Sequence, residues 1–246
     1  LYFLDCGRHL DWGYVDHAPL IGLVAKLALL LGGSLPLLRT IAALAGAGAL
    51  ALAMVMAARL GGGRFAQLLA GIAMLVTGGN LAMSSLFTMN GFEPLFWMGC
   101  AWALIRIIQT GDSRPWLVFG LLAGVGLENK HSMVFFLIAI VLGVLATPER
   151  RELVRPWFWL GAALALLLFL PNLVWQWQHG FPTLEDLRNV KAMGKNVVLS
   201  PLTFVGQQAM SMHPATLPVW RSGLGFFLFG RGTRFRALGV TYLALL

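Results

Sequence analysis

Uncharged apolar stretches alternate with short charged segments along most of the chain. Stretches without Asp, Glu, Lys or Arg cover residues 40–58, 65–92, 94–105, 115–127, 132–148 and 156–178. A helix needs about 20 residues to cross the roughly 30 Å hydrocarbon core of a bilayer. Several of these stretches reach that length only if polar residues lie at membrane depth. Together with an apolar run near residues 218–230, they predict an all-α polytopic helical bundle with about seven crossings and part of another.

Two segments depart from this pattern. Residues 20–31 are apolar but too few to span, and Lys26 lies among them, so residues 17–33 are predicted to contain an interfacial helix. Residues 176–208 form a long polar connection. We therefore predict one transmembrane domain over residues 1–246. Its parts are an outer loop with the interfacial helix (1–34), a bundle (35–175), an extracytoplasmic loop (176–208) and further spans (209–246). Because the chain begins without Met and ends within an uncharged run, we expect it to be truncated at both ends.

The composition supports the membrane assignment. Hydrophobic residues make up 58% of the 246 residues and charged residues only 11%, whereas about 25% are charged in an ordinary soluble domain. A soluble globular protein, a disordered chain and a disulfide scaffold are thereby excluded. The net charge of +8 would suggest nucleic acid in a soluble protein. Here ten of the 18 basic residues lie in one alternate set of loops, with arginines at positions 59, 64, 106, 114, 150, 151, 155, 231, 234 and 236.

That set of loops is assigned to the cytoplasm by the positive-inside rule. The basic excess is then an orientation signal, and nucleic acid is not an expected partner, whereas membrane lipids are. All five histidines and seven of the ten acidic residues lie in the other set. The candidate chemistry is therefore expected on the extracytoplasmic face.

The densest group of polar residues is Glu128-Asn129-Lys130-His131-Ser132. Arg114 precedes Glu128 by 14 residues, about 21 Å of helix, which is short of the far side of the apolar core. Ionisable groups at that depth are costly and usually functional. The segment is either a recessed cation site for an anionic group or a tight turn with a structural Glu–Lys pair.

Two further segments carry polar residues on the same predicted face. Asn90 and Glu93 precede Pro94, which is predicted to lie in the first turn of a helix. At that position Glu93 could serve only to stabilise the helix start, through its interaction with the helix dipole. The N-terminal loop, residues 8–20, alternates acids, histidines and aromatics. Its acids could simply be solvated, and its Asp and His residues match a metal site loosely at best.

The long connection contains Trp175 and Trp177 at the end of an apolar stretch. Tryptophans at that position are typical of an aromatic belt at the membrane interface, and sugar stacking is the alternative. Thr183 and Asp186 have the spacing of a capping box, so a short helix is expected over residues 184–191.

Four of these stretches, in this order, resemble the polytopic GT-C type glycosyltransferases of family 39. This group includes bacterial relatives of protein O-mannosyltransferases and of the lipid A aminoarabinose transferase. The matching stretches are residues 8–20 (RHLDWGYVDHAPL), 90–97 (NGFEPLFW), 124–132 (GVGLENKHS) and 170–172 with 181–185 (LPN and FPTLE). The resemblance implies transfer of a sugar from a polyprenyl-phosphate donor to a lipid, glycan or protein acceptor at the outer face of a bacterial inner membrane.

The resemblance also implies roles for individual residues. Asp16 and Glu93 are the candidate catalytic carboxylates, and a further acidic pair is expected before Leu1. Lys130 matches a lysine associated with the donor phosphate. His17 stands where relatives often have lysine. The candidate donor-phosphate group is completed by Arg8, and the candidate substrate pocket contains His9, Tyr14, Asn90, Glu128, His131 and Asn172.

Elementary chemistry is consistent with these roles. A sugar that leaves from phosphate needs cations near the departing oxygens, and the acceptor hydroxyl needs a carboxylate to take its proton. No cofactor is required by this chemistry; a divalent metal is compatible with it, but no ligand spacing indicates one. A membrane transporter or lipid flippase is the alternative from another class, because intramembrane charges also suit transport. A non-catalytic membrane scaffold would leave Glu128 and Lys130 unexplained.

Overall fold

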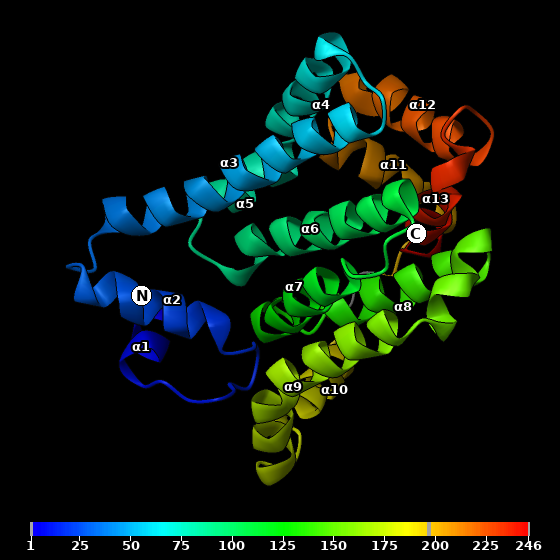
Figure 1. Ribbon diagram of the computed structural model, residues 1–246. Helices are drawn as coiled ribbons and strands as arrows, with labels where there is room; N and C mark the ends of the chain where they lie inside the picture. Colours follow the sequence, from blue (N-terminus) through cyan, green and yellow to red (C-terminus); the bar gives the residue numbers. More distant parts are fainter. Residues whose placement is uncertain (1, 196–197, 246) are drawn as a thin grey trace.

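The computed structural model describes residues 2–195 and 198–245 (Figure 1). Within these residues the chain forms helices and loops and contains no β-strand. The α-helices are α1 (Tyr2–Arg8), α2 (Leu20–Leu30), α3 (Leu35–Arg59), α4 (Arg64–Val76), α5 (Gly78–Ser85), α6 (Met89–Thr110), α7 (Trp116–Asn129), α8 (Met133–Leu145), α9 (Pro156–Gln178), α10 (Pro182–Ala192), α11 (Pro201–Ser211), α12 (Leu217–Leu228) and α13 (Arg236–Leu245). Short 3-10 helices lie at Pro148–Val154 (η1), Pro214–Thr216 (η2) and Thr233–Phe235 (η3). The predicted all-α class is confirmed.

Three helices, α3, α6 and α9, are each long and apolar enough to cross a bilayer alone. Two bent pairs pass the same test together: α4 with α5, bent by 66°, and α8 with η1, bent by 112°. The described residues therefore contain three candidate spans, or up to five if each bent pair is one span. The count of seven crossings stays a prediction.

The uncharged stretch 65–92 is not one helix, contrary to its simplest interpretation. Helix α4 ends at Val76, Thr77 adopts extended backbone, and α5 then runs only to Ser85. The hydroxyl of Thr77 donates to the Ala73 carbonyl at 2.8 Å. Helix α6 begins at Met89, so the prediction that Pro94 starts a helix is also wrong. Pro94 lies inside α6, where its missing N–H leaves the carbonyl of Asn90 without the usual helical donor.

Loops with many arginines gather at one end of the bundle, on the right of Figure 1. The guanidinium of Arg234 donates to the Ile108 carbonyl at 2.7 Å, and the Gln109 amide donates to the Arg59 carbonyl. The indole of Trp116 donates to Glu152 at 3.2 Å. These bonds join the loops near residues 59, 109, 152 and 234, which we call the arginine end. The sorting of loops into two sets, predicted from charge, is matched by this arrangement.

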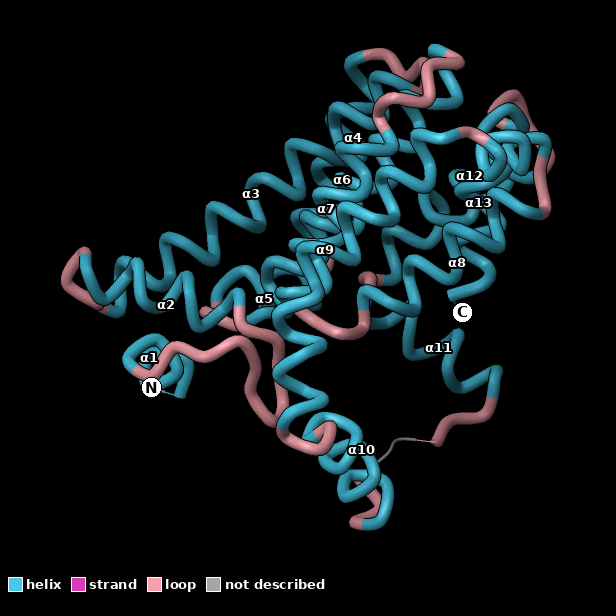
Figure 2. Tube along the Cα trace, turned by 60° about the horizontal axis from the view of Figure 1, so that its bottom comes forward, coloured by secondary structure: helices cyan, strands magenta, loops and turns pink. Residues whose placement is uncertain are grey.

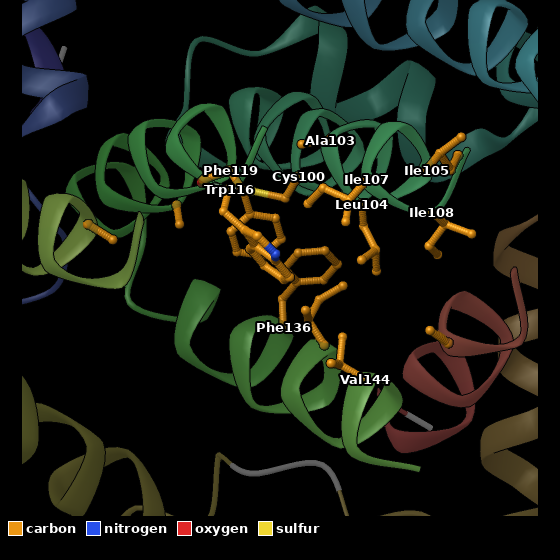
Figure 3. Close-up of a cluster of buried hydrophobic side chains, with 14 of the residues drawn as sticks. Cys100, Ala103, Leu104, Ile105, Ile107, Ile108, Trp116, Phe119, Phe136 and Val144 are labelled. Atoms are coloured by element: carbon orange, nitrogen blue, oxygen red, sulfur yellow. Dashed lines mark hydrogen bonds between the residues drawn. The ribbon is translucent and has the colours of Figure 1, made fainter. Parts of the chain in front are cut away.

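A buried apolar cluster lies between α6, α7 and α8 (Figure 3). Its members include Cys100 and Leu104 of α6, Trp116 and Phe119 of α7, and Phe136 of α8. Helix α7 also crosses α9 very closely. The approach is possible because Gly120 has no side chain: a Cβ atom there would overlap the carbonyl oxygen of Gly161. Helix α7 is therefore held on both sides, and so is the turn that follows it.

The predicted long outer connection contains more structure than expected. The short helix predicted at residues 184–191 is confirmed as α10, which lies beyond the end of α9 (Figure 2). The capping box is wrong: Phe181 precedes the helix with φ 59°, and the Thr183 hydroxyl accepts from the Gln176 amide at 2.7 Å instead. Helix α11 was not predicted. Helix α2 confirms the expected short helix after the N-terminal loop.

Candidate active site

The turn between α7 and α8, residues 130–132, lies one short helix away from the arginine end. Helix α7 rises from the arginine end for only 14 residues, about 20 Å. Glu93 lies thirteen residues before Arg106 on α6, again about 20 Å, and Asn172 lies sixteen residues after Pro156 on α9, about 24 Å. All three distances fall short of a core about 30 Å thick. These helix lengths agree with the predicted recess of the polar side chains below the surface opposite the arginine end, which stays a prediction.

At this turn Lys130 forms an ion pair with Glu93. The two atoms Lys130 Nζ and Glu93 Oε2 are 3.0 Å apart, and the Ser132 hydroxyl donates to Glu93 Oε1. The two side chains are 31% and 18% exposed, so the pair is shielded but reachable. Glu93 also lines a cavity of about 690 Å³ whose other lining residues are mostly apolar and come from α4, α5, α6, α8, α11, η2, α12 and α13. A cation and a carboxylate thus stand together at the edge of a largely apolar space.

Neighbouring amides fix the turn to three other segments. The side-chain amide of Asn129 donates to the Met89 carbonyl at 2.9 Å. Asn172, fully buried on α9, donates through Nδ2 to the Trp12 carbonyl at 2.7 Å. Its Oδ1 lies 3.0 Å from His131 Nε2. Because Oδ1 can only accept, Nε2 of His131 carries the proton. The turn, α9 and the N-terminal loop are therefore connected by hydrogen bonds.

The N-terminal loop holds a second polar group, around Asp16 and His17. The Tyr2 hydroxyl donates to Asp16 Oδ1 at 2.5 Å. His17 is 1% exposed and stacks on Tyr14, with ring centroids 4.5 Å apart. Its Nδ1 lies 2.8 Å from the Ala18 carbonyl, which requires a proton on Nδ1, so Nε2 is left to accept from the Cys6 thiol at 3.6 Å. Burial raises the pKa of Cys6, which keeps this thiol protonated and able to donate.

Of the remaining predicted residues of this loop, Arg8 and His9 are exposed and Tyr14 is half-buried. Arg8 is exposed and lies 3.9 Å from Asp5, the nearest carboxylate on α1. His9 and Tyr14 line a cavity of about 350 Å³ together with Trp175 of α9. The Tyr14 hydroxyl donates to the Cys6 carbonyl at 2.9 Å. Trp175 stacks on His179 with centroids 4.2 Å apart.

The structure thus brings the predicted residues together in two groups. Lys130 pairs with Glu93 and His131 with Asn172, whereas Asp16, His17 and Tyr14 form the N-terminal group. Aromatic contacts lead from one group to the other: Phe3, which packs on His17, contacts Phe87, and Phe87 contacts Phe92 beside Glu93. Asn90 lies on the first turn of α6. Among the described residues, no direct hydrogen bond or ion pair joins Asp16 to the Lys130–Glu93 pair.

Glu128 lies on the last turn of α7 and has a different environment from Glu93. Both of its carboxylate oxygens are buried and have no hydrogen-bond partner among the described residues. It lines a cavity of about 630 Å³ that also contains Asp11 of the N-terminal loop. Within residues 2–195 and 198–245, no three His, Cys, Asp or Glu residues gather as metal ligands would.

A comparison with protein families matches residues 16–175 to the family described as dolichyl-phosphate-mannose-protein mannosyltransferase. The chain belongs to this mannosyltransferase family. No curated protein and no solved structure matches it. The matched region begins at Asp16 and includes Glu93, the turn at Lys130 and Asn172, whereas Arg8, His9 and Tyr14 precede it.

Membership of the mannosyltransferase family decides between the function classes that the sequence left open. The chain is a multi-pass membrane glycosyltransferase of a family that uses a lipid-phosphate mannose donor, not a transporter or a scaffold. Sequence reasoning gave no role to Ser132, Asn129 or Cys6. For Ser132 a signal was present, since it lies two residues after Lys130 at the start of α8. For Cys6, no spacing indicated its contact with His17.

Proposed function

We propose that this chain transfers a sugar from a polyprenyl-phosphate donor to an acceptor hydroxyl at the extracytoplasmic face of a bacterial inner membrane. The observation that carries the proposal is the recessed group of Lys130, Glu93 and Ser132 beside a largely apolar cavity. A polyprenyl phosphate has one anionic group on a long apolar chain. Its phosphate suits Lys130 and its chain suits the cavity of about 690 Å³ that Glu93 lines.

In this proposal Lys130 stabilises the leaving phosphate. The bond between the sugar's anomeric carbon and the phosphate oxygen breaks, and the electron pair stays on that oxygen. A cation held at this depth interacts with the growing negative charge more strongly than it would in water. Arg8, which is exposed, is the second cation of the proposed donor-phosphate site. His17 is buried with both ring nitrogens bonded inside the loop, so we propose that it supports the loop that follows Arg8 and does not supply a charge.

A carboxylate takes the proton of the acceptor hydroxyl as that oxygen bonds to the anomeric carbon. Asp16 and Glu93 are the two candidates among the described residues. Asp16 is exposed and holds one hydrogen bond, from Tyr2. Glu93 is held by two partners, Lys130 and Ser132. The weaker hold on Asp16 favours it as the base, with Glu93 positioning Lys130. The products are the glycosylated acceptor and polyprenyl phosphate, with the proton on the carboxylate.

The proposed orientation follows from the distribution of charge. The arginine end, in which ten basic residues gather, is assigned to the cytoplasm. The Lys130–Glu93 pair and the N-terminal loop then lie toward the periplasm or cell exterior. No cofactor is included in the proposed reaction.

The test uses the full-length protein in liposomes that contain polyprenyl-phosphate mannose, with release of polyprenyl phosphate as the readout. We expect Lys130→Ala to lower turnover by about 10²–10³-fold, because it removes the charge at the leaving group. We expect Asp16→Asn to lower it by about 10²–10⁴-fold, because it removes a general base. Lys191→Ala, at an exposed lysine of α10, is the control. Normal turnover in both variants would contradict the assignment of the site.

A further inference from the structure

The segment between α8 and α9, residues 148–155, carries arginines that the described chain leaves unpaired. The chain bends by 112° where α8 meets η1, so this segment lies across the arginine end of the bundle. Its three arginines, Arg150, Arg151 and Arg155, are exposed. The two ion pairs among the described residues both lie elsewhere, one at the turn and one on α1. No carboxylate of the described chain is therefore in ion-pairing distance of these three guanidinium groups.

The two acidic residues of the same segment do not act as partners of its arginines. Glu152 accepts a hydrogen bond from the indole of Trp116 at 3.2 Å, so its carboxylate is engaged by α7. Glu149 is half-buried and forms no ion pair with a basic side chain of the described residues. The charge of the arginines is thus left for a partner outside this segment.

Arg234 shows how another arginine of this end serves the fold. Its guanidinium group donates to the carbonyls of Ile108 and Gln109, at 2.7 and 3.1 Å, and so joins two loops. Within residues 2–195 and 198–245, the side chains of Arg150 and Arg151 make no such hydrogen bond. Their guanidinium groups therefore stabilise no contact inside the described protein.

Arg150 and Arg151 line a cavity of about 330 Å³ at the end of α8. The remaining lining residues are Ala146, Thr147 and Pro148. The Thr147 hydroxyl donates back to a carbonyl of α8 at 2.9 Å, so it is already satisfied. Because no acid is among the described lining residues, the cavity favours an anion. Guanidinium groups match phosphate in particular, because each presents a planar pair of donors to two oxygens.

An exposed apolar stripe on α8 leads to this cavity. It consists of Phe135, Ile138, Leu142 and Leu145, which recur every three or four residues and so share one face of the helix. Their exposed fractions are 69%, 52%, 47% and 48%. Leu145 is followed directly by Ala146, which belongs to the cavity lining. The cationic cavity thus lies at the end of an apolar surface, as the head-group site of a lipid does.

The exposed side chain of Trp159 marks the same level on α9. It is 63% exposed, and its indole donates to the Leu153 carbonyl of η1 at 2.9 Å. Tryptophans with an apolar ring exposed and the N–H bonded are typical of the membrane interface. This contact indicates that η1 lies where the head groups of a bilayer meet the acyl chains.

We propose that the cavity at Arg150 and Arg151 binds the phosphate head group of an anionic phospholipid from the bilayer. The two guanidinium groups donate to the phosphate oxygens, and one acyl chain lies along the stripe on α8. A zwitterionic lipid is disfavoured, because its ammonium group adds a positive charge beside the arginines. The inference requires only that the chain is a multi-pass membrane protein, as its family is, and it does not depend on the proposed sugar transfer.

The test measures lipid binding by the full-length protein in nanodiscs of phosphatidylcholine. A small part of the lipid is replaced by phosphatidylglycerol that carries a diazirine at the end of one acyl chain. A parallel sample contains phosphatidylcholine with the same diazirine. At equal probe content, we expect at least about tenfold more label in α8, Met133–Leu145, from the phosphatidylglycerol probe, because two arginines contact its head group. Unlabelled phosphatidylglycerol should compete, whereas inorganic phosphate should have no more effect than chloride at equal ionic strength.

Variants of the two arginines locate the preference. Arg151→Gln should lower it about fivefold, and Arg150→Gln combined with Arg151→Gln should nearly abolish it. Arg150→Lys combined with Arg151→Lys keeps both charges and should retain most of the preference. Both positions are exposed, so folding should be unchanged, and monodisperse yield checks this.

The matched control removes two charges from the arginine end outside the cavity. Arg231→Gln combined with Arg236→Gln affects exposed residues that do not line it. The preference for phosphatidylglycerol should be largely unchanged, because salt screens charges that do not contact the head group.

Equal labelling of α8 by the two probes in the wild-type protein would overturn the proposal, as would an unchanged preference in the double glutamine variant. An equal loss in the control variant would also overturn it, because the attraction would then belong to the whole surface. Displacement of the lipid label by inorganic phosphate at equal ionic strength would show a site for free phosphate and would likewise contradict lipid binding.

Discussion

The turn at residues 130–132 and the N-terminal loop both carry charged and polar residues of the candidate site, but they are built differently. At the turn, Lys130 and Glu93 satisfy each other, and rigid helices hold both. In the loop, Asp16 and Arg8 are exposed, while His17 is buried with both ring nitrogens facing protein atoms. The charges near the turn are thus shielded and paired, whereas those of the loop face solvent and its histidine packs inside the loop. The difference suggests that the turn fixes geometry and that the loop supplies adjustable groups.

The largest effect is expected where the turn depends on helix packing. Gly120→Leu should prevent α7 from approaching α9, because even a Cβ atom at this position would overlap the Gly161 carbonyl. We expect loss of folded protein, measured as monodisperse yield in detergent. Gly225→Ala, where a Cβ atom would meet nothing within 4 Å, is the control. Normal yield of Gly120→Leu would show that the turn does not need this contact.

Next in size is the effect of removing the charge from the turn while keeping its shape. Lys130→Met should lower turnover by about 10²–10³-fold, and Glu93→Gln combined with it should lower turnover little further, because the two side chains act as a pair. The measurement is polyprenyl phosphate release by the single and double variants. Independent, additive losses would contradict a shared role.

The link between the two regions is the side chain of Asn172. Asn172→Ala should lower the free energy of unfolding by about 1–3 kcal/mol, because the Trp12 carbonyl and His131 both lose a hydrogen-bond partner. Hydrogen exchange is expected to rise in residues 9–16 more than in α6. Equal protection in the variant and the wild type would show that the loop is held independently of α9.

The smallest effect is expected in the loop. Tyr2→Phe removes the one hydrogen bond to Asp16 and leaves the ring in place. A net contribution of about 1 kcal/mol corresponds to a change of roughly fivefold in turnover. Phe3→Tyr, at the next aromatic ring, is a matched control for added or lost hydroxyls. A loss as large as that of Lys130→Met would show that the loop, not the turn, dominates the site.

Much of the fold could be predicted from two patterns. Uncharged stretches indicate apolar helices, and arginine-rich loops indicate which helix ends lie on the same side of the bundle. The interior breaks could not be predicted in the same way. Thr77 and Pro94 lie within uncharged sequence, so hydropathy gives no sign that one helix bends at the first and that another continues through the second. Their conformations depend on contacts with distant segments, such as the Met212 carbonyl 3.4 Å from the Thr77 hydroxyl.

The site was accessible to sequence reasoning only in part. The recess of Lys130 and Glu93 was predicted by counting residues to the nearest arginines. The structural pair considered for Lys130 was with Glu128 in the same turn, whereas the structure pairs it with Glu93 of α6. The environments of His17 and Glu128 did not follow. Whether a titratable side chain has hydrogen-bond partners depends on atoms that folding brings close to it, as it brings the Cys6 thiol to His17.

The depth of the turn has an electrical consequence. If the arginine end lies at one membrane surface, as proposed, Lys130 lies about 20 Å into a layer about 30 Å thick. An anion that reaches it from the opposite surface then crosses about a third of the membrane voltage. At about 2.3 kcal/mol per charge for 100 mV, this amounts to about 0.8 kcal/mol for each negative charge. In the proposed orientation, an interior-negative potential opposes the approach of the phosphate, so collapsing the potential should raise donor occupancy about fourfold per charge.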